Sequence, residues 1–508
     1  MALIALLIAL LLALVFHYLW TMFLWRPYVV TKAFGKQGVR GPPYELWFGS
    51  LREIQSIRRA AMEVVLDIDA HDITTRVLPH FGKWIAEYGE TFLFWVGAQP
   101  LVCISQPEMV RQVLARKFGF YSRLAPSPEA LALVGKGLVY IEGAEWVRHR
   151  RVVNPAFSMD KLKLLTTTMA DCVKLMLEGW QEAAREGKEV EVSEQFQVVT
   201  ADVISHTAFG SSFKEGKELF LAQKQMLNLV TQNFLNVNFP GSRYVPSKKN
   251  LQTLKLKKRI RGMFMNIIED RLARRDAGCS SNDLLGLLLE SEKVQAGDQK
   301  LNMEEIIDEC KTFFLAGHET TSHLLTWTMF LLSSNPDWQQ KLREEVDEVC
   351  GLEVPNADMI SNLKLMTLVL LESLRLYSPI VLLRRKAAKD MILGNIKIMK
   401  GTLLMMPISI IHRNKEIWGA DANEFNPLRF KNGISKAAKN PNAFLTFSIG
   451  PRACIGQNFA MLEAKTVMAM ILQRFSFSLS PNYKHVPIDS ATVVVPQYGL
   501  PIVLKALH

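Results

Sequence analysis

Ten residues near the C-terminus, 447–456, constrain this 508-residue chain more than any other stretch. They combine an aromatic residue, two glycines, a proline, an arginine and a single cysteine, Cys454, and an apolar pattern of helical period follows at once. Glycine and proline before a helix predict a tight loop with exposed backbone N–H groups, whose dipoles stabilise a thiolate. Such a cysteine suits the axial position of a metal, and the alternative is a buried apolar cysteine in a turn.

The spacing of this loop resembles the haem-binding signature of the cytochrome P-450 family, the haem-thiolate monooxygenases. The resemblance implies a mainly α-helical fold with small β-sheets, and haem b with Cys454 as the axial ligand of its iron. It also implies that the other signature positions belong to the cofactor-binding loop, namely Phe447, Gly450, Arg452 and Gly456.

A long apolar run opens the chain. Residues 2–25 contain no Asp, Glu, Lys or Arg, and 24 helical residues span roughly 36 Å, enough to cross a bilayer core of about 30 Å. The run ends in bulky aromatic residues, where a cleaved signal peptide would have small ones. We expect a transmembrane anchor at 1–26, a hinge at 27–45 that includes Gly38-Val-Arg-Gly-Pro-Pro43, and one haem-thiolate catalytic domain at 46–508.

Charge and composition narrow the class of protein further. Basic residues follow the anchor and none precedes it, which predicts a single-pass protein with its catalytic domain on the cytosolic face. We expect the membrane to be that of the endoplasmic reticulum, although no residue of the sequence specifies the organelle. The net charge of +11 is spread along the chain, so nucleic-acid binding has no support. The six cysteines form no Cys-x-x-Cys pair and therefore predict no zinc motif.

Two strands and then many helices are expected in the catalytic domain. Alternating runs at 92–96 and 101–104 predict a small N-terminal sheet, and patterns of period 3.6 dominate from about residue 107 onward. Trp146 and Arg150 share one face of a predicted helix and could both donate to a haem propionate. The alternative is a Trp packed under an exposed Arg, but the pair matches the Trp-x-x-x-Arg pattern of the resembled family.

Further propionate donors are expected elsewhere in the chain. Arg385 matches a family position that reaches a propionate, although Arg384 beside it leaves the assignment open. His412, in a run that reads as a strand, is another candidate. Two buried propionates require charge-assisted partners, which favours several donors over one.

The longest helical pattern covers 301–335, with a capping box predicted at Asn302 and Glu305. Its middle reads Ala316-Gly-His-Glu-Thr-Thr321, which is similar to the oxygen-activation motif of the same family. We expect Thr320 to bond to a backbone carbonyl one turn back and Glu319 to supply it with protons, so both are assigned as catalytic. The alternative for the segment alone is a polar helix face.

A buried ion pair is predicted between Glu372 and Arg375, which resemble the structural Glu-x-x-Arg element of the family. Arg429, in Pro427-Leu-Arg-Phe430, is the expected third partner, although Leu428 departs from the polar residue usual there.

No Gly-x-Gly-x-x-Gly follows a strand, so electrons must come from another protein. The resemblance implies NADPH–cytochrome P-450 reductase in that role, with O2 as co-substrate. Two other classes stay open. They are a haem-thiolate isomerase that needs no reductase and a non-catalytic haem-binding protein.

The substrate is expected to be a small lipophilic molecule, because the candidate lining segments 118–137, 313–316, 380–383 and 493–500 are mostly apolar. Arg123 or Arg384 could bind a substrate carboxylate. Several stretches look like a plant membrane-bound clan that includes sub-terminal fatty-acid hydroxylases and cytokinin trans-hydroxylases, among them His71-Asp-Ile, Phe118-Gly-Phe, Phe239-Pro-Gly-Ser-Arg and Asp308-Glu-Cys-Lys-Thr-Phe-Phe. Sub-terminal hydroxylation of a fatty acid is the preferred expectation, and a cytokinin, a terpenoid or another plant hormone is the alternative.

Overall fold

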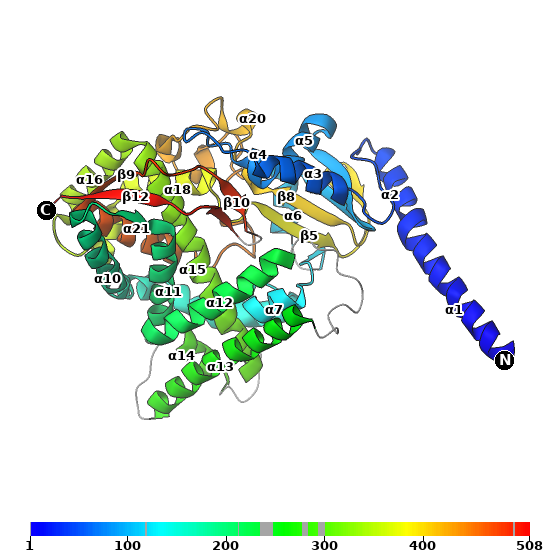
Figure 1. The fold of residues 1–508 in the computed structure, drawn as a ribbon, viewed down its shortest axis with the longest axis horizontal. Coiled ribbons are helices and arrows are strands. Elements are labelled where there is room, and N and C mark those ends of the chain that lie inside the picture. Colours follow the sequence, from blue (N-terminus) through cyan, green and yellow to red (C-terminus); the bar gives the residue numbers. More distant parts are fainter. Residues whose placement is uncertain are drawn as a thin grey trace.

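The computed structural model describes residues 2–116, 119–211, 213–233, 247–276, 283–292, 300–490 and 493–507. The motif at 239–243 and Phe118 lie outside these residues. Helices dominate and the strands form small sheets (Figure 1), which confirms the predicted fold class. The helices that follow the N-terminal segment are α3 (Leu51–Met62), α4 (Thr74–Val77), α5 (Pro79–Tyr88), α6 (Pro107–Ala115), α7 (Pro128–Val134), α8 (Gly143–Val153), α9 (Met159–Leu164), α10 (Thr166–Arg185), α11 (Val192–Phe209), α12 (Phe213–Asn233), α13 (Lys248–Asp276), α14 (Leu284–Glu292), α15 (Met303–Ser334), α16 (Pro336–Cys350), α17 (Ala357–Asn362), α18 (Lys364–Leu376), α19 (Ile408–Ile411), α20 (Lys415–Trp418) and α21 (Gln457–Arg474), with short 3-10 turns η2 (Asn154–Phe157), η4 (Pro427–Phe430) and η5 (Ile434–Lys436).

The strands belong to four small sheets. The largest has the order β1-β2-β8-β5-β3, and the second has the order β4-β12-β9. The predicted N-terminal sheet is confirmed, since β1 and β2 pair antiparallel with Phe94 opposite Leu101. The strands are β1 (Thr91–Val96), β2 (Gln99–Ile104), β3 (Tyr121–Ser122), β4 (Glu189–Glu191), β5 (Leu382–Ala387), β6 (Met391–Leu393), β7 (Ile396–Ile398), β8 (Leu403–Pro407), β9 (Phe475–Leu479), β10 (Pro487–Asp489), β11 (Val494–Pro496) and β12 (Pro501–Ala506).

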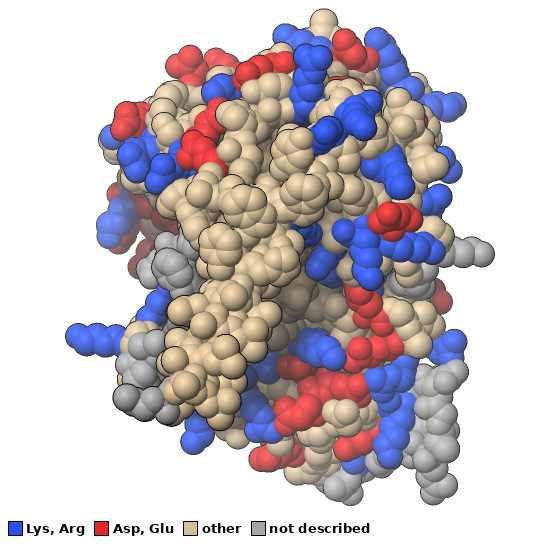
Figure 2. Space-filling view, turned by 90° about the vertical axis from the view of Figure 1, so that its right-hand side faces the viewer, with Lys and Arg blue, Asp and Glu red and all other residues tan. Residues whose placement is uncertain are grey.

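The N-terminal segment is one continuous helix that projects from the body (Figure 1). It comprises α1 (Ala2–Trp20), the π-helical turn η1 (Thr21–Trp25) and α2 (Arg26–Gly35). The helix is long and apolar enough to cross a membrane, with a mean hydropathy of 2.7 in its most apolar window, and none of that window is buried in the protein. Figure 2 shows it as an uncharged column in front of a body that carries both signs of charge.

The helix runs further than the sequence suggested, into the segment 27–45 that was expected to be a hinge. Pro27 lies just after the π-helical turn η1 within this continuous helix, at a point where the regular hydrogen-bond ladder is already interrupted. Val30 and Phe34, one turn apart, are buried against the body. Burial of this stripe therefore extends the helix to Gly35.

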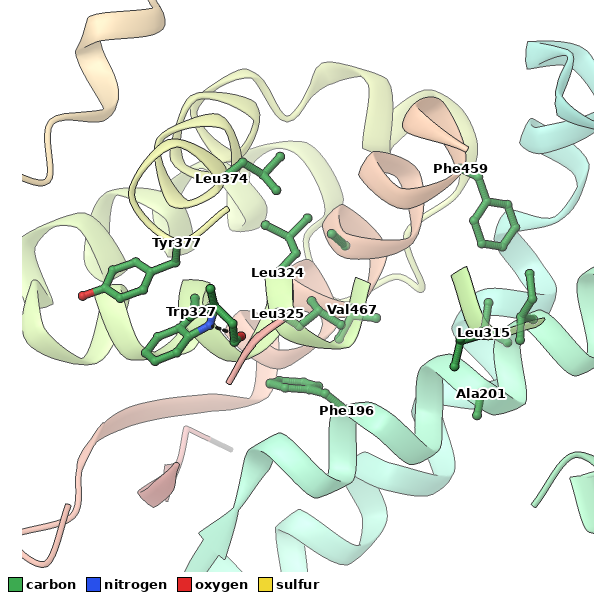
Figure 3. Packing of buried hydrophobic residues seen from close by; sticks show 14 of the residues in the cluster. Phe196, Ala201, Leu315, Leu324, Leu325, Trp327, Leu374, Tyr377, Phe459 and Val467 are labelled. Carbon is green, nitrogen blue, oxygen red and sulfur yellow. Dashed lines mark hydrogen bonds between the residues drawn. The ribbon is translucent and has the colours of Figure 1, made fainter. Parts of the chain in front are cut away.

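Helix α15 crosses the centre of the domain and its capping box is present as predicted, with Asn302 accepting from the Glu305 N–H and Glu305 accepting from the Asn302 N–H. Its apolar side chains Leu324, Leu325 and Trp327 are surrounded by residues of α11, α18 and α21 (Figure 3). These four helices enclose the core that positions the site.

Candidate active site

A cavity of about 310 Å³ lies between α15 and the loop at 447–456. Thr320 lines one wall, and the opposite wall is formed by Cys454 and the start of α21. The lining is mostly apolar, and its only charged members among the described residues are three arginines, Arg123, Arg150 and Arg452. A cavity that offers cations and no carboxylate is suited to an apolar molecule with anionic groups.

The cysteine loop is folded tightly against the body. Gly450 has a φ of 79°, and a Cβ there would come within 2.6 Å of the Leu114 carbonyl oxygen. The Cys454 N–H donates to the Phe447 carbonyl at 2.8 Å and closes the loop. The Cys454 side chain is exposed and lines the cavity. Gly456 ends the loop directly before α21.

Two opposing effects act on the thiol. Burial raises the pKa of Cys454, whereas a hydrogen bond from the Gly456 N–H and the charge of Arg150 lower it, and burial prevails. A bound metal cation reverses this balance, because coordination deprotonates a thiol. Without a cation the site thus favours the neutral thiol, and coordination of a metal would favour the thiolate.

Trp146 stands between two of the cavity arginines. The Arg150 guanidinium lies 5.9 Å from the Trp146 ring and the Arg452 guanidinium lies 5.0 Å from it. Arg150 Nη1 donates weakly to the Ala453 carbonyl at 3.4 Å, and Arg452 Nη2 donates to the Ile141 carbonyl at 2.6 Å. The helix α8 thus brings Trp146 and Arg150 to the cysteine loop, as their shared face predicted.

Arg385 and Arg384 face different surroundings, since neighbours on strand β5 point to opposite sides. Burial, followed by the charges of Arg123 and Arg452, lowers the pKa of Arg385 to about 9. Arg384 instead interacts electrostatically with Asp489 and Tyr140. Arg385 therefore belongs to the arginine cluster and Arg384 does not.

Arg123 completes this cluster and was not predicted as a cofactor residue. Its Nε is buried without a hydrogen-bond partner among the described residues, and its backbone N–H donates to Glu142. One carboxylate, Glu142, faces three clustered guanidinium groups, Arg123, Arg385 and Arg452. The excess positive charge and the orphaned Nε fit an anionic group such as a haem propionate.

The expectation for His412 is wrong. It follows helix α19 instead of lying in a strand, and its side chain is fully buried. Its Nδ1 lies 3.1 Å from the Arg375 carbonyl, and its Nε2 accepts from the Leu445 N–H at 2.9 Å. Both ring nitrogens are occupied within the core, so this side chain has no donor for a propionate.

Thr320 makes the contact that its sequence position predicts. Its hydroxyl donates to the Ala316 carbonyl at 2.8 Å, one turn back, and the side chain is exposed to the cavity. Gly317 beside it also lines the cavity, and a Cβ there would meet Ile204 Cδ1 of α11 at 2.8 Å. The close packing of α11 against α15 therefore also requires a residue without a side chain at position 317.

Glu319 is buried and does not line the cavity. Its Oε1 lies 3.4 Å from His323 Nε2, and its Oε2 lies 3.8 Å from His318 Nδ1. Burial would raise its pKa, but the hydrogen bond from His323 and the charges of both histidines outweigh it, and the pKa is lowered. The carboxylate thus has two histidine partners on its own helix.

Beneath the cysteine loop, Arg375 and Glu372 form a buried ion pair at 2.7 Å. Arg429 approaches Glu372 to 3.6 Å, but its hydrogen bonds go to Asp421 and to the Trp418 carbonyl. Asp421 is the partner that the motif did not reveal, because it lies outside the pattern Pro427-Leu-Arg-Phe430.

The apolar lining agrees with the predicted segments in part. Phe313, Ile380 and Leu383 line the cavity, as expected. The segment 493–500 contributes no lining residue among its described members, because the Trp327 indole donates to the Val494 carbonyl at 2.9 Å and holds that strand elsewhere (the dashed line at Trp327 in Figure 3). Ile204 of α11 lines the cavity and had no signal in the sequence beyond apolarity.

Comparisons with known proteins agree with this geometry. A family model described as Cytochrome P-450 matches residues 74–503. Cytochrome P-450 709B1 of Arabidopsis thaliana is 49% identical over 494 residues, which is 95% of this chain and 94% of the relative. Cytochrome P-450 CYP72A616 of Paris polyphylla is 43% identical over 490 residues, with 95% and 94% covered. The cytokinin hydroxylase of Arabidopsis thaliana is 40% identical over 486 residues, with 95% and 93% covered.

Proposed function

Because this chain belongs to the cytochrome P-450 family, we propose that it inserts one oxygen atom of O2 into a C–H bond of a lipophilic molecule, with a fatty acid hydroxylated at a sub-terminal carbon as the preferred substrate. Members of the family are oxidoreductases that act as monooxygenases and bind haem through a cysteine thiolate. The observation that carries the proposal is the cavity with Cys454 on one wall and Thr320 on the other.

We assign the haem iron to Cys454, with Phe447, Gly450 and Gly456 forming the loop that holds the thiolate. The propionate donors in this proposal are Arg123, Trp146, Arg150, Arg385 and Arg452. The arginine cluster with its single carboxylate supports this part of the assignment. Glu372, Arg375 and Arg429 are assigned a structural role beneath the loop.

When bound through a thiolate, haem supplies the activation of O2. The residues of this chain supply the proton and exclude water. Thr320 holds a hydroxyl proton at Oγ1, on the cavity side of α15, and its bond to the Ala316 carbonyl fixes that position. Glu319 faces away from the cavity, toward His318 and His323. Because its pKa is lowered, it carries no proton of its own, so we propose that it turns from these partners and relays a proton taken up from solvent to Thr320.

The apolar lining supports a lipophilic substrate, since aromatic and aliphatic side chains surround the space next to Thr320, among them Phe157, Ile204, Phe313, Leu324, Ile380 and Leu383. Among the cations that line the cavity, Arg123 is the candidate for binding a substrate carboxylate. Its neighbours Arg385 and Arg452 place it in the arginine cluster, however, and this favours the propionates as its partners. A fatty acid would then be held mainly through its chain.

A cytokinin is the second candidate substrate, because a relative that matches nearly the full chain is a cytokinin hydroxylase. The two substrates differ in a way that a variant can test. A fatty acid carries a carboxylate and an isoprenoid adenine does not. If Arg123 binds the substrate, Arg123→Gln would weaken fatty-acid binding more than cytokinin binding. If Arg123 binds a propionate, as we assign it, the variant would not distinguish the two substrates.

Electrons come from a separate redox partner, for which we propose NADPH–cytochrome P-450 reductase. The apolar N-terminal helix supports a single membrane span. We place the protein in the endoplasmic reticulum membrane with the catalytic domain on the cytosolic face, where that reductase is accessible.

The decisive experiment is turnover of the full-length protein, co-expressed with a plant reductase, on fatty acids, isoprenoid adenines and terpenoids, with products identified by mass. We expect a gain of one oxygen atom on a fatty acid, dependent on NADPH. Product formed without reductase would indicate an isomerase, and a lack of NADPH consumption with every substrate would indicate a non-catalytic haem-binding protein. Loss of the thiolate-type carbon-monoxide spectrum in Cys454→Ala tests the ligand assignment separately.

A further inference from the structure

A second group of metal-ligating side chains lies away from the cavity, where α10 packs against α11 (Figure 1). Cys172 of α10 faces Asp202 and His206 of α11, and one ligand atom from each lies within 4.8 Å of the other two. Asp202 and His206 are four residues apart and therefore share a helix face. None of the three lines the cavity next to Thr320.

The Asp202 carboxylate lies between the other two side chains. Its side chain is 10% exposed, and its Oδ1 lies 3.3 Å from His206 Nε2, at ion-pair distance, without a hydrogen bond among the described residues. The Cys172 thiol hydrogen-bonds to the same carboxylate. The three side chains thus converge on one point, where a bound cation could replace these contacts.

A small cavity adjoins Asp202. Its volume is about 10 Å³, and it is lined by Val198, Ala201, Asp202, Lys217 and Phe220. A space of this size holds about one water molecule. Cys172 and His206 do not line it, so it can hold a water molecule beside the carboxylate, whereas the ion itself would lie between the three side chains.

We propose that Cys172, Asp202 and His206 form a binding site for Zn²⁺, with water as the fourth ligand. A thiolate, an imidazole and a carboxylate suit zinc, whereas Mg²⁺ and Ca²⁺ take oxygen ligands. Ligands of tetrahedral zinc lie roughly 3.3–3.8 Å apart, so side-chain rotations of about 1 Å would close the group around the ion. Binding replaces the S–H bond of Cys172 with a Zn–S bond, and the proton leaves to solvent.

Zinc at this position would link α10 to α11 by a metal bridge. Helix α11 also supports the central helix, since Ile204 packs against Gly317 and Thr200 Oγ1 donates to the His318 carbonyl at 3.1 Å. We therefore expect bound zinc to stabilise the helices behind the active site without entering it.

The test is zinc binding by the full-length, haem-loaded protein after removal of any affinity tag, measured by equilibrium dialysis against ZnCl2. We expect one equivalent of zinc to bind, and Cys172→Ser and His206→Gln each to weaken binding roughly tenfold or more. Asp171→Asn is the matched control, because it removes an adjacent charge without removing a ligand, and it should bind zinc with nearly unchanged affinity. Absence of saturable binding, or equal affinity in all variants, would overturn the proposal.

A second measurement uses the unaltered protein and does not depend on the folding of a variant. Alkylation of each thiol is followed by peptide mapping with and without zinc. Zinc should slow alkylation of Cys172 and leave buried Cys350 on α16 unchanged. Equal alkylation rates for Cys172 in both conditions would overturn the site.

Discussion

Arg375 donates two hydrogen bonds to Glu372, both at 2.7 Å, and neither side chain is exposed to solvent. Its remaining N–H groups donate to the carbonyls of His412, Ala422 and Glu424, so the whole guanidinium fork is satisfied. A buried ion pair is tolerated when each group has partners of this kind. The pair joins helix α18 to the segments before the cysteine loop.

Arg375→Met should lower the free energy of unfolding by about 3–5 kcal/mol, the range for removing one partner of a buried ion pair. The methionine side chain has no donor, so the Glu372 carboxylate and the three carbonyls lose the hydrogen bonds of the guanidinium group. Denaturant unfolding of the haem-loaded protein, followed by tryptophan fluorescence, measures the change.

The matched control is the exposed pair of Lys174 and Asp171, which has the same i, i+3 spacing and the same distance of 2.7 Å. Lys174→Ala should change the free energy of unfolding by less than about 1 kcal/mol, because solvent screens this pair. Equal losses in the two variants would show that burial is not what gives the Arg375 pair its importance.

Arg385→Ala should release haem more readily than Arg384→Ala, although the residues are adjacent. Arg385 shares the arginine cluster with Arg123 and Arg452, whereas Arg384 faces Asp489. Loss of one charge-assisted hydrogen bond corresponds to roughly a tenfold faster dissociation. Transfer of haem to an excess of apomyoglobin gives both rates. Similar dissociation rates for the two variants would contradict the assignment of Arg385 as a propionate donor.

Thr320→Ala should uncouple electron use from product formation, with product per NADPH falling roughly tenfold or more. Thr320→Ser should retain most of the coupling, since it keeps the hydroxyl that donates to Ala316. Thr326→Ala is the control, because Thr326 Oγ1 makes the same contact with the Ser322 carbonyl, at 2.8 Å, away from the cavity. Unchanged coupling in Thr320→Ala would contradict the proposed proton transfer.

The sequence was most informative where local spacing determines geometry. The capping box at Asn302 and the back-bond of Thr320 each involve residues within four positions, and both are present as expected. The ion pair of Glu372 and Arg375 is likewise set by one helical turn. Helix periodicity alone places such groups together.

Contacts between distant elements could not be predicted. Asp421 binds Arg429, and Ile204 reaches the cavity from α11, because packing brings these elements together after folding. His412 was read as part of a strand because its Ile-Ile neighbours are apolar and β-branched, but tertiary contacts place it after the short helix α19. Alternation along β5 separated Arg385 from Arg384, yet only the structure showed which of them faces Arg123.

Because several histidines are buried, we expect the free energy of unfolding to decrease on mild acidification. Burial is the leading cause that lowers the pKa of His71 to about 4 and the pKa values of His412 and His485 to about 3. An unfolded histidine has a pKa of about 6.5, so between pH 6.5 and 4 the unfolded chain binds protons that the folded chain does not. The stability from these groups is therefore complete above pH 6.5 and is lost as the pH falls, by about 2 kcal/mol for each such histidine at pH 5.

We expect the unfolding temperature to be several degrees lower at pH 5 than at pH 7, which thermal scans of tryptophan fluorescence would measure. His485→Gln should flatten this dependence even if it also lowers stability at pH 7, because His485 hydrogen-bonds to Tyr377 and Tyr483 in the core and one buried titrating group is removed. His206→Gln is the control, since the His206 side chain is 36% exposed and its replacement removes no buried imidazole. An unfolding temperature that stays constant or rises between pH 7 and pH 5 would contradict this prediction. It would mean that the buried imidazoles are protonated in the folded state as readily as in the unfolded chain.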